Sequence, residues 1–167
     1  DLVALAERIL LMNAVRDALA AERVSEAELR DLYEAQIADF TSIHAKHILV
    51  EAKATAERIA AEATPATFGD LAAQYSIDPG SKDVGGDLGS IPETSLDPDF
   101  VAGALALEPG EIGPPVQTQF GWHVILLVSI DVTPFADVEE QLRSQQAMEV
   151  YVDWFRATIG SADIEVN

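Results

Sequence analysis

Two histidines each introduce a short apolar run rich in β-branched residues. His47 precedes residues 48–50, and His123 precedes residues 124–126. Such runs predict buried strands, and on neighbouring strands the two imidazoles can meet in one layer. Paired neutral imidazoles hydrogen-bond with fixed tautomers and can order a third group, for which the hydroxyl of Thr118 is well placed in the sequence. For either histidine alone, the competing interpretation is a structural ring satisfied by a backbone group.

Other kinds of active site find little support in the residues. His44 and His47 are three positions apart, so on one strand they point to opposite faces and cannot share a metal ion. The glycine-rich stretch 85–89 lacks the nucleotide-binding patterns G-x-G-x-x-G and G-x-x-x-x-G-K-[ST]. The aspartates between residues 78 and 87 do not have the spacing of an EF-hand loop. The chain has no cysteine, which excludes thiolate chemistry. We therefore expect no metal site and no phosphate-binding loop of these kinds.

Amphipathic helices are predicted at both ends of the chain. Apolar residues recur at helical spacing over residues 2–19 and 29–40, and a capping-box pattern at Ser25 introduces the second helix. A third long helix begins around Pro134 and ends near Gly160. Because each helix has an apolar face that must be covered, we expect the helices from the two ends to pack on each other. Independent terminal helices are the alternative.

The middle of the chain combines strands and helices. Residues 45–50 and 124–130 are apolar and rich in β-branched side chains, which indicates buried strands. Between them, the segments 53–63, 67–75 and 98–107 have the apolar spacing of helices. Strands and helices in this order predict a compact α+β unit.

This order of elements divides the chain into three parts. We expect a central domain at residues 44–131, inserted between an N-terminal helical part, residues 1–43, and a C-terminal helical part, residues 132–167. At 167 residues the chain is too short for two full-size domains.

The composition narrows the possible partners. Ten Lys and Arg residues stand against 29 Asp and Glu, a net charge of -19. Such a surface repels phosphate backbones, so we expect no nucleic-acid partner. The longest apolar runs are too short to span a bilayer. Because the chain begins at Asp1 rather than Met, a signal or membrane anchor removed before this numbering stays open.

Five segments in succession resemble the motifs of parvulin-type peptidyl-prolyl isomerases. In chain order they are HAKHILV (44–50), FGDLAAQYS (68–76), DPGS (78–81), GGDLG (85–89) and VQTQFGWHV (116–124). The flanking helical segments are similar to those of bacterial extracytoplasmic foldases and chaperones of the SurA, PpiD and PrsA kind. The resemblance implies a small antiparallel or mixed sheet surrounded by helices and inserted into a helical, chaperone-like region.

The resemblance also assigns catalytic roles position by position. His47 and His123 match the paired active-site histidines, and Thr118 matches the hydroxyl residue of their network. Asp78 falls where some relatives have cysteine and many bacterial ones aspartate. It would lie near the substrate carbonyl, where it acts either protonated or by orienting its neighbours.

A second set of positions matches the substrate pocket of this family. Leu88, Leu96 and Phe100 correspond to the apolar pocket for the proline ring, and Phe120 lies at its rim. Ordinary core packing is the alternative for these four. The chain reads Val-Glu-Ala-Lys at residues 50–53, without the basic cluster of relatives that require a phosphorylated residue before proline, so we expect no phosphate site.

The function implied by the resemblance is peptidyl-prolyl cis-trans isomerisation during the folding of secreted or envelope proteins. The substrates would be unfolded or extended polypeptides that contain proline, and the location would be outside the cytoplasmic membrane of a bacterium. Catalysis would be non-covalent, by stabilising the twisted X-Pro amide, with no cofactor. The alternative is a polypeptide-binding chaperone whose isomerase domain has little or no activity.

Overall fold

The computed structural model describes residues 1–161, and its contacts divide the chain into two compact units. One unit joins Asp1–Gln36 to the chain from Pro134 onward, and the other is Ile37–Thr133. The last six positions of the predicted C-terminal helical part, 162–167, lie outside the described residues. The helices are α1 (Leu2–Arg23), α2 (Glu26–Ala35), α3 (Lys53–Glu62), α4 (Phe68–Tyr75), α5 (Pro98–Leu105) and α6 (Phe135–Ser161), with 3-10 turns η1 (Ile37–Phe40), η2 (Lys82–Val84) and η3 (Glu93–Ser95). The strands are β1 (Thr41–Val50), β2 (Asp87–Pro92), β3 (Val116–Thr118) and β4 (Gly121–Val132).

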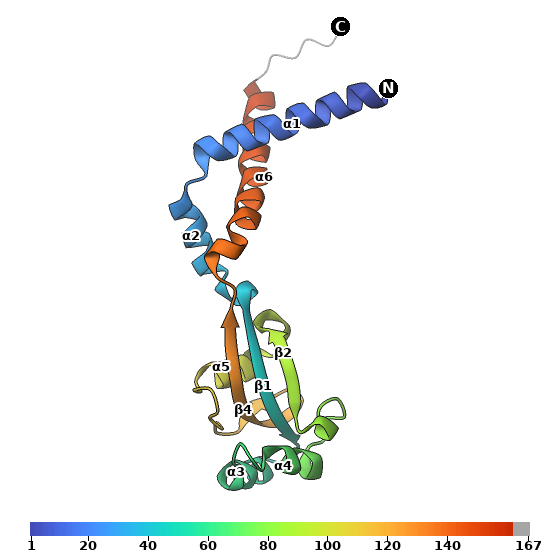
Figure 1. The fold of residues 1–167 in the computed structure, drawn as a ribbon, viewed down its shortest axis with the longest axis vertical. Helices are drawn as coiled ribbons and strands as arrows, with labels where there is room; N and C mark the ends of the chain where they lie inside the picture. Colours follow the sequence, from blue (N-terminus) through green and yellow to red (C-terminus); the bar gives the residue numbers. More distant parts are fainter. Residues whose placement is uncertain (162–167) are drawn as a thin grey trace. The chain divides into compact units, whose positions relative to one another are not determined.

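Helices from both ends of the chain form the first unit (Figure 1). The predicted capping box is present: Ser25 accepts from the N–H of Glu28, and the Glu28 carboxylate accepts from the N–H of Ser25. Tyr33 of α2 packs edge-on against Phe135 of α6, with ring centroids 5.7 Å apart. The guanidinium of Arg143 in α6 donates to the carbonyl that follows α1. The prediction that the terminal helices pack together is confirmed.

An antiparallel sheet of order β2-β1-β4-β3 forms the centre of the second unit. The two predicted strands are its central pair, β1 and β4, and both extend beyond the predicted bounds. Central strands are covered on both faces, which explains why these segments are apolar at successive positions. The β1–β4 register shifts between His44 and Ala45, where β4 has one extra residue.

Helices cover both faces of this sheet. On one face, Ile48 and Val124 belong to a core shared with α3 and α4. On the other face, Ala45 and Ile125 belong to a core shared with α5, in which Phe100 and Ala104 are buried. The predicted helices of the middle segment are confirmed to within two residues at their ends.

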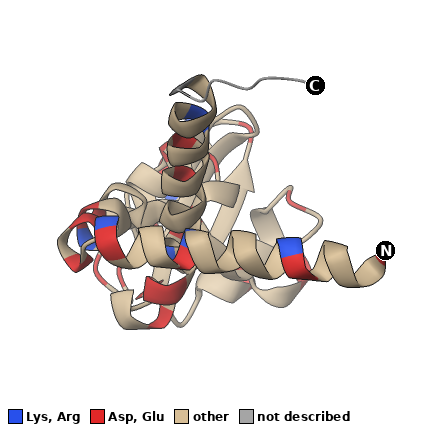
Figure 2. Ribbon diagram, turned by 90° about the horizontal axis from the view of Figure 1, so that it is seen from above, with Lys and Arg blue, Asp and Glu red and all other residues tan. Residues whose placement is uncertain are grey.

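The acidic composition is spread over both units, where Asp and Glu outnumber Lys and Arg (Figure 2). In the described part of the chain, no helix combines the length and the apolar character needed to cross a membrane.

Candidate active site

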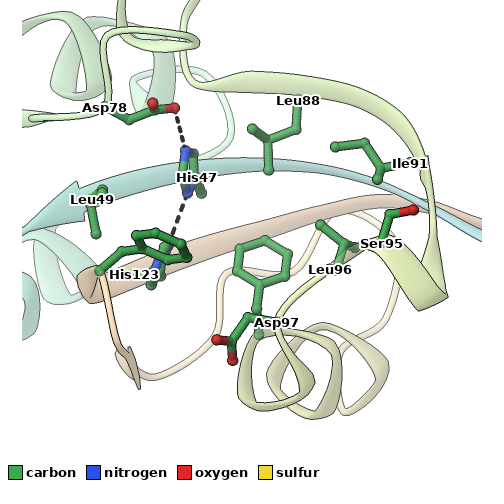
Figure 3. A pocket seen from close by; sticks show the side chains of 11 residues that line it. His47, Leu49, Asp78, Leu88, Ile91, Ser95, Leu96, Asp97 and His123 are labelled. Carbon is green, nitrogen blue, oxygen red and sulfur yellow. Dashed lines mark hydrogen bonds and ion pairs between the residues drawn. The ribbon is translucent and has the colours of Figure 1, made fainter.

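The two histidines singled out by the sequence are in direct contact. In the β1–β4 register His47 lies opposite Ile125, two residues from His123, so the histidines are diagonal neighbours on one face of the sheet. Their Nδ1 atoms are 3.0 Å apart, and the rings stack with centroids separated by 5.2 Å (Figure 3). Both rings are buried. The arrangement differs from a structural histidine satisfied by a backbone group, because each ring uses the other as its partner.

Polar side chains extend this pair at both ends. At one end the Nε2 atom of His47 is 2.8 Å from a carboxylate oxygen of Asp78 and 3.0 Å from the hydroxyl of Ser81. At the other end the Nε2 atom of His123 is 2.8 Å from the hydroxyl of Thr118. The backbone N–H of Phe120 donates to that hydroxyl at 3.1 Å. The result is one hydrogen-bonded row from Asp78 to Thr118.

The carboxylate of Asp78 is the ionised end of this row. Partial burial works against ionisation, but hydrogen bonds from Ser81, His47 and the N–H of Gly80 outweigh it and lower the pKa of Asp78 to about 2. An ionised carboxylate only accepts hydrogen bonds, so His47 donates to it from Nε2. Of the two roles considered for Asp78, orientation of its neighbours is the one that this geometry favours.

The opposite end of the row is neutral. Burial, and then the nearby charge of His47, lower the pKa of His123 to about 4. In the state in which both rings are neutral and Asp78 is ionised, one set of donors is consistent: Thr118 donates to His123, His123 donates through Nδ1 to His47, and His47 donates to Asp78. The tautomer of each ring is therefore fixed by its neighbours.

A pocket of about 330 Å³ opens beside the histidine pair (Figure 3). The ring of Phe100 stands edge-on to both imidazoles, with centroids 6.0 Å from His47 and 5.5 Å from His123. Phe120 is 64% exposed at its margin. The side chains lining the pocket are His47, Leu49, Asp78, Leu88, Ile91, Ser95, Leu96, Asp97, Phe100, Phe120 and His123.

The structure brings together all eight residues named from the sequence. Seven of them line the pocket, and the eighth, Thr118, lies behind it on the far side of His123. Two further residues at the site were not predicted from the sequence: Ser81, which is buried and donates to the Asp78 carboxylate, and Asp97, which lines the pocket. A serine three residues after an aspartate in a turn was the available signal for Ser81, because such a turn returns the hydroxyl to the carboxylate.

Within residues 1–161, no three His, Asp or Glu side chains lie together in a way that could hold a metal ion. His44 bonds through Nε2 to Asp87 at 2.9 Å, apart from the His47 pair.

Comparison with known proteins agrees with this geometry. Residues 37–129 match the family described as the PPIC-type PPIase (rotamase) domain. The foldase protein PrsA of Caldanaerobacter subterraneus is 40% identical over 123 residues, which cover 73% of this chain and 40% of that protein. Foldase protein PrsA 1 of Bacillus cereus is 32% identical over 170 residues, which cover 94% of this chain and 57% of that protein. The chain thus spans about half the length of the curated relatives it matches.

Solved structures show the same arrangement of elements. The crystal structure of PrsA from Bacillus anthracis matches with a TM-score of 0.55 at 28% identity, covering 100% of this chain and 77% of that one. A structure described for PEB4 and the periplasmic protein Cj1289, SurA-like chaperones of Campylobacter jejuni, matches with a TM-score of 0.55 at 27% identity. That match covers 99% of this chain and 73% of the other. An α+β domain of the expected kind, a histidine pair beside an apolar pocket and a family match over residues 37–129 lead to one conclusion: this chain belongs to the PPIC-type, or parvulin, family of peptidyl-prolyl cis-trans isomerase domains.

Proposed function

We propose that this protein accelerates cis-trans isomerisation of X-Pro bonds in unfolded or extended polypeptides, with His47, Asp78, Thr118 and His123 as the catalytic network. The observation that carries the proposal is the hydrogen-bonded histidine pair packed against Phe100 beside an apolar pocket. Leu88, Leu96 and Phe100 hold the proline ring, and Phe120 contacts the substrate at the margin.

The physical task is to favour a twisted amide. Resonance holds the planar amide against rotation with a barrier of about 18–20 kcal/mol. Only contacts that are stronger in the twisted state than in either planar isomer lower this barrier, by about tenfold in rate for each 1.4 kcal/mol or so. A rigid apolar pocket can grip the ring while the rest of the peptide rotates. No bond breaks, so no cofactor is needed.

The hydrogen-bonded row contributes rigidity and a fixed pattern of polarity. With the tautomers fixed, the rings present the same atoms to the pocket in every cycle, so little reorganisation is needed as the amide twists. The Asp78 carboxylate accepts from Ser81, His47 and Gly80. These contacts make it an anchor for His47 rather than a group that contacts the substrate carbonyl.

The test is the exchange of a proline tetrapeptide measured by NMR, with and without the protein. We expect exchange broadening at substoichiometric protein. The variant His47→Leu should reduce it, whereas Glu51→Ala, an exposed change after β1, should not. Absence of acceleration by the unaltered protein would reject the enzymatic function.

A second candidate function is chaperone-like binding of polypeptides by the helical unit. The observation that favours it is the exposed apolar surface of α1, where Leu2, Leu10 and Leu11 are 84%, 68% and 66% exposed. Exposed apolar side chains gathered on one helix are typical of surfaces that bind other polypeptides. Failure to suppress aggregation of an unfolded client at stoichiometric protein would reject this function and leave the enzymatic one intact.

We further propose that the protein acts outside the cytoplasmic membrane of a bacterium on secreted or envelope proteins. The support is the similarity to PrsA foldases and to SurA-like chaperones, one of them named as periplasmic. A signal or membrane anchor on the complete gene product is part of this proposal. Fractionation of the native cells would test the location.

A further inference from the structure

The Asp, Glu, Lys and Arg side chains that line the pocket proposed for the proline ring are all acidic. Two carboxylates line it, Asp78 and Asp97, and within residues 1–161 no lysine or arginine does so. In Figure 3 the two carboxylates lie on opposite sides of the pocket. The mechanism uses Asp78 as an anchor of His47, but it gives Asp97 no role.

The backbone explains where Asp97 stands. It is the N-cap of α5, immediately before Pro98, and its Oδ1 atom accepts from the N–H of Asp99 at 3.0 Å. This cap holds Asp97 in the lining of the pocket, three residues before Phe100. The side chain is only half-buried, so an incoming peptide can reach it.

The negative charge of Asp97 affects the pKa of His123 inside the site. It acts to raise the pKa of His123, against the larger opposing effects of burial and of His47, and its influence there exceeds that of Asp78. A cation placed in the same pocket would interact favourably with the same carboxylate.

We propose that Asp97 makes this site select X-Pro bonds in which X is lysine or arginine and disfavour those in which X is acidic or phosphorylated. The inference rests on the proposed isomerase function and names its substrate class. The Cα atoms of X and proline are about 3–4 Å apart in either isomer. With the ring held by Leu88 and Leu96, a long cationic side chain at X can therefore reach Asp97, which lines the same pocket.

The expected size of the preference follows from a solvent-accessible charge pair. Such pairs contribute up to about 1 kcal/mol, which corresponds to about fivefold in kcat/KM. The preference should also depend on salt, because the screening length falls from about 10 Å at 0.1 M to about 3 Å at 1 M.

The experiment compares tetrapeptides Ala-X-Pro-Phe, acetylated at the N-terminus and amidated at the C-terminus, in which X is lysine, norleucine or glutamate. Norleucine matches the apolar part of lysine without its charge. Isomerisation by the full chain is measured as kcat/KM by NMR exchange at 0.1 M and 1 M NaCl. We expect the lysine peptide to exceed norleucine about fivefold at low salt, glutamate to be slowest, and the differences to shrink below twofold at 1 M NaCl.

The matched variants are Asp97→Asn and Asp99→Asn. Asparagine at position 97 keeps the oxygen that caps α5 and removes only the charge, and we expect it to lower the lysine-to-norleucine ratio to below twofold. Asp99→Asn removes the same charge two residues away, outside the pocket lining, and should leave the ratio unchanged.

The outcomes separate the two proposals. Absence of acceleration on every peptide rejects the isomerase function itself. Equal acceleration of the lysine and norleucine peptides by the unaltered protein rejects the charge selection alone. If the lysine-to-norleucine ratio of kcat/KM is unchanged in Asp97→Asn, or if Asp99→Asn lowers it as much as Asp97→Asn does, the preference comes from the general acidity of the chain. Either result overturns the role of Asp97. If Asp97→Asn does not fold, the peptide series and its salt dependence in the unaltered protein still decide whether charge selection exists.

Discussion

The neutral state of His123 is the residue-scale feature with the most direct test. Its pKa of about 4 lies below the ordinary value of 6.5, with burial as the main cause. In a pH titration followed by NMR of the imidazole resonances, we expect His123 to stay neutral down to about pH 5. Titration of this ring above pH 6 would contradict the buried, directional network.

The lowered pKa of His123 also predicts how the free energy of unfolding depends on pH. Between about pH 6.5 and 4 the unfolded chain binds a proton at His123 that the folded domain does not, so the free energy of unfolding falls as pH falls through this window. Lowering the pKa of His123 from 6.5 to about 4 corresponds to a loss of roughly 3 kcal/mol in the free energy of unfolding across this window. Because the pKa of Asp78 is lowered from 3.8 to about 2, its contribution is lost below about pH 4. In chemical denaturation followed at several pH values, His123→Gln should flatten the slope of stability between pH 6.5 and 4.

Phe100 should matter more for catalysis than a charge outside the pocket. Its ring contacts both imidazoles and lines the pocket, so we expect Phe100→Ala to lower kcat/KM at least tenfold, about 1.4 kcal/mol of transition-state stabilisation. Glu51→Ala should stay within twofold. Truncating a buried phenylalanine also costs about 3–5 kcal/mol of stability, so activity is compared at a temperature where circular dichroism shows both variants folded. Equal effects would contradict the pocket assignment.

At the residue scale, the sequence predicted which residues lie around the pocket better than it predicted their protonation and hydrogen bonding. The histidines could be paired because strand alternation places each on a defined face, and the family resemblance supplied the others. The ionised state of Asp78 was not predictable, since it depends on the hydroxyl of Ser81 and the N–H of Gly80, both placed by a turn. Asp97 was missed because an aspartate before a proline is equally a helix cap, and only the fold shows that this cap faces the pocket.

At the scale of elements, the loop before β2 holds β1 in place through a glycine. Gly86 has a φ of +79°, and its carbonyl accepts from the N–H of His47 at 2.8 Å. A Cβ atom there would lie 2.3 Å from the carbonyl oxygen of His47, in backbone that cannot give way cheaply. We expect Gly86→Ala to cost about 3 kcal/mol or more of stability and to reduce isomerisation, because β1 must move.

Gly89 provides the matched control for that variant. Its φ of +69° imposes a similar left-handed conformation, but a Cβ atom there would meet nothing within 4 Å. Gly89→Ala should therefore cost only the conformational strain, about 1–2 kcal/mol. If thermal denaturation shows equal losses for the two variants, the close approach to His47 is not what requires glycine at position 86.

Element boundaries were predictable where periodicity is strong and not where a turn decides them. The helices of the middle segment and the capping box at Ser25 follow from apolar spacing and local hydrogen bonding. The edge strands β2 and β3 were not predicted as separate strands, because β2 is short and contains glycine and β3 has three residues. The register shift after His44 likewise depends on tertiary pairing and has no local signal.

At the scale of the whole molecule, the two units differ in how they are connected. The unit Ile37–Thr133 is one continuous stretch whose ends meet, since the N–H of Thr133 donates to the carbonyl of Phe40 at 2.8 Å. The helical unit is discontinuous and needs α6 from the far end of the chain to cover α1 and α2. The division at residues 43 and 131 expected from the sequence stays a prediction. Because one unit is continuous and the other is made of two segments, fragments of the chain can test a domain division.

A fragment that consists of residues 37–133 alone should be a folded isomerase. This stretch contains the sheet, the helices on both of its faces and the complete pocket, so we expect cooperative unfolding and a kcat/KM within about twofold of the full chain on a tetrapeptide. Residues 1–36 alone should lack stable structure, because the apolar faces of α1 and α2 lose their cover when α6 is absent. Circular dichroism and the NMR exchange assay measure both fragments. An inactive or unfolded 37–133 fragment would mean that the catalytic domain depends on the terminal helices, whereas an active one that no longer suppresses client aggregation would separate catalysis from polypeptide binding.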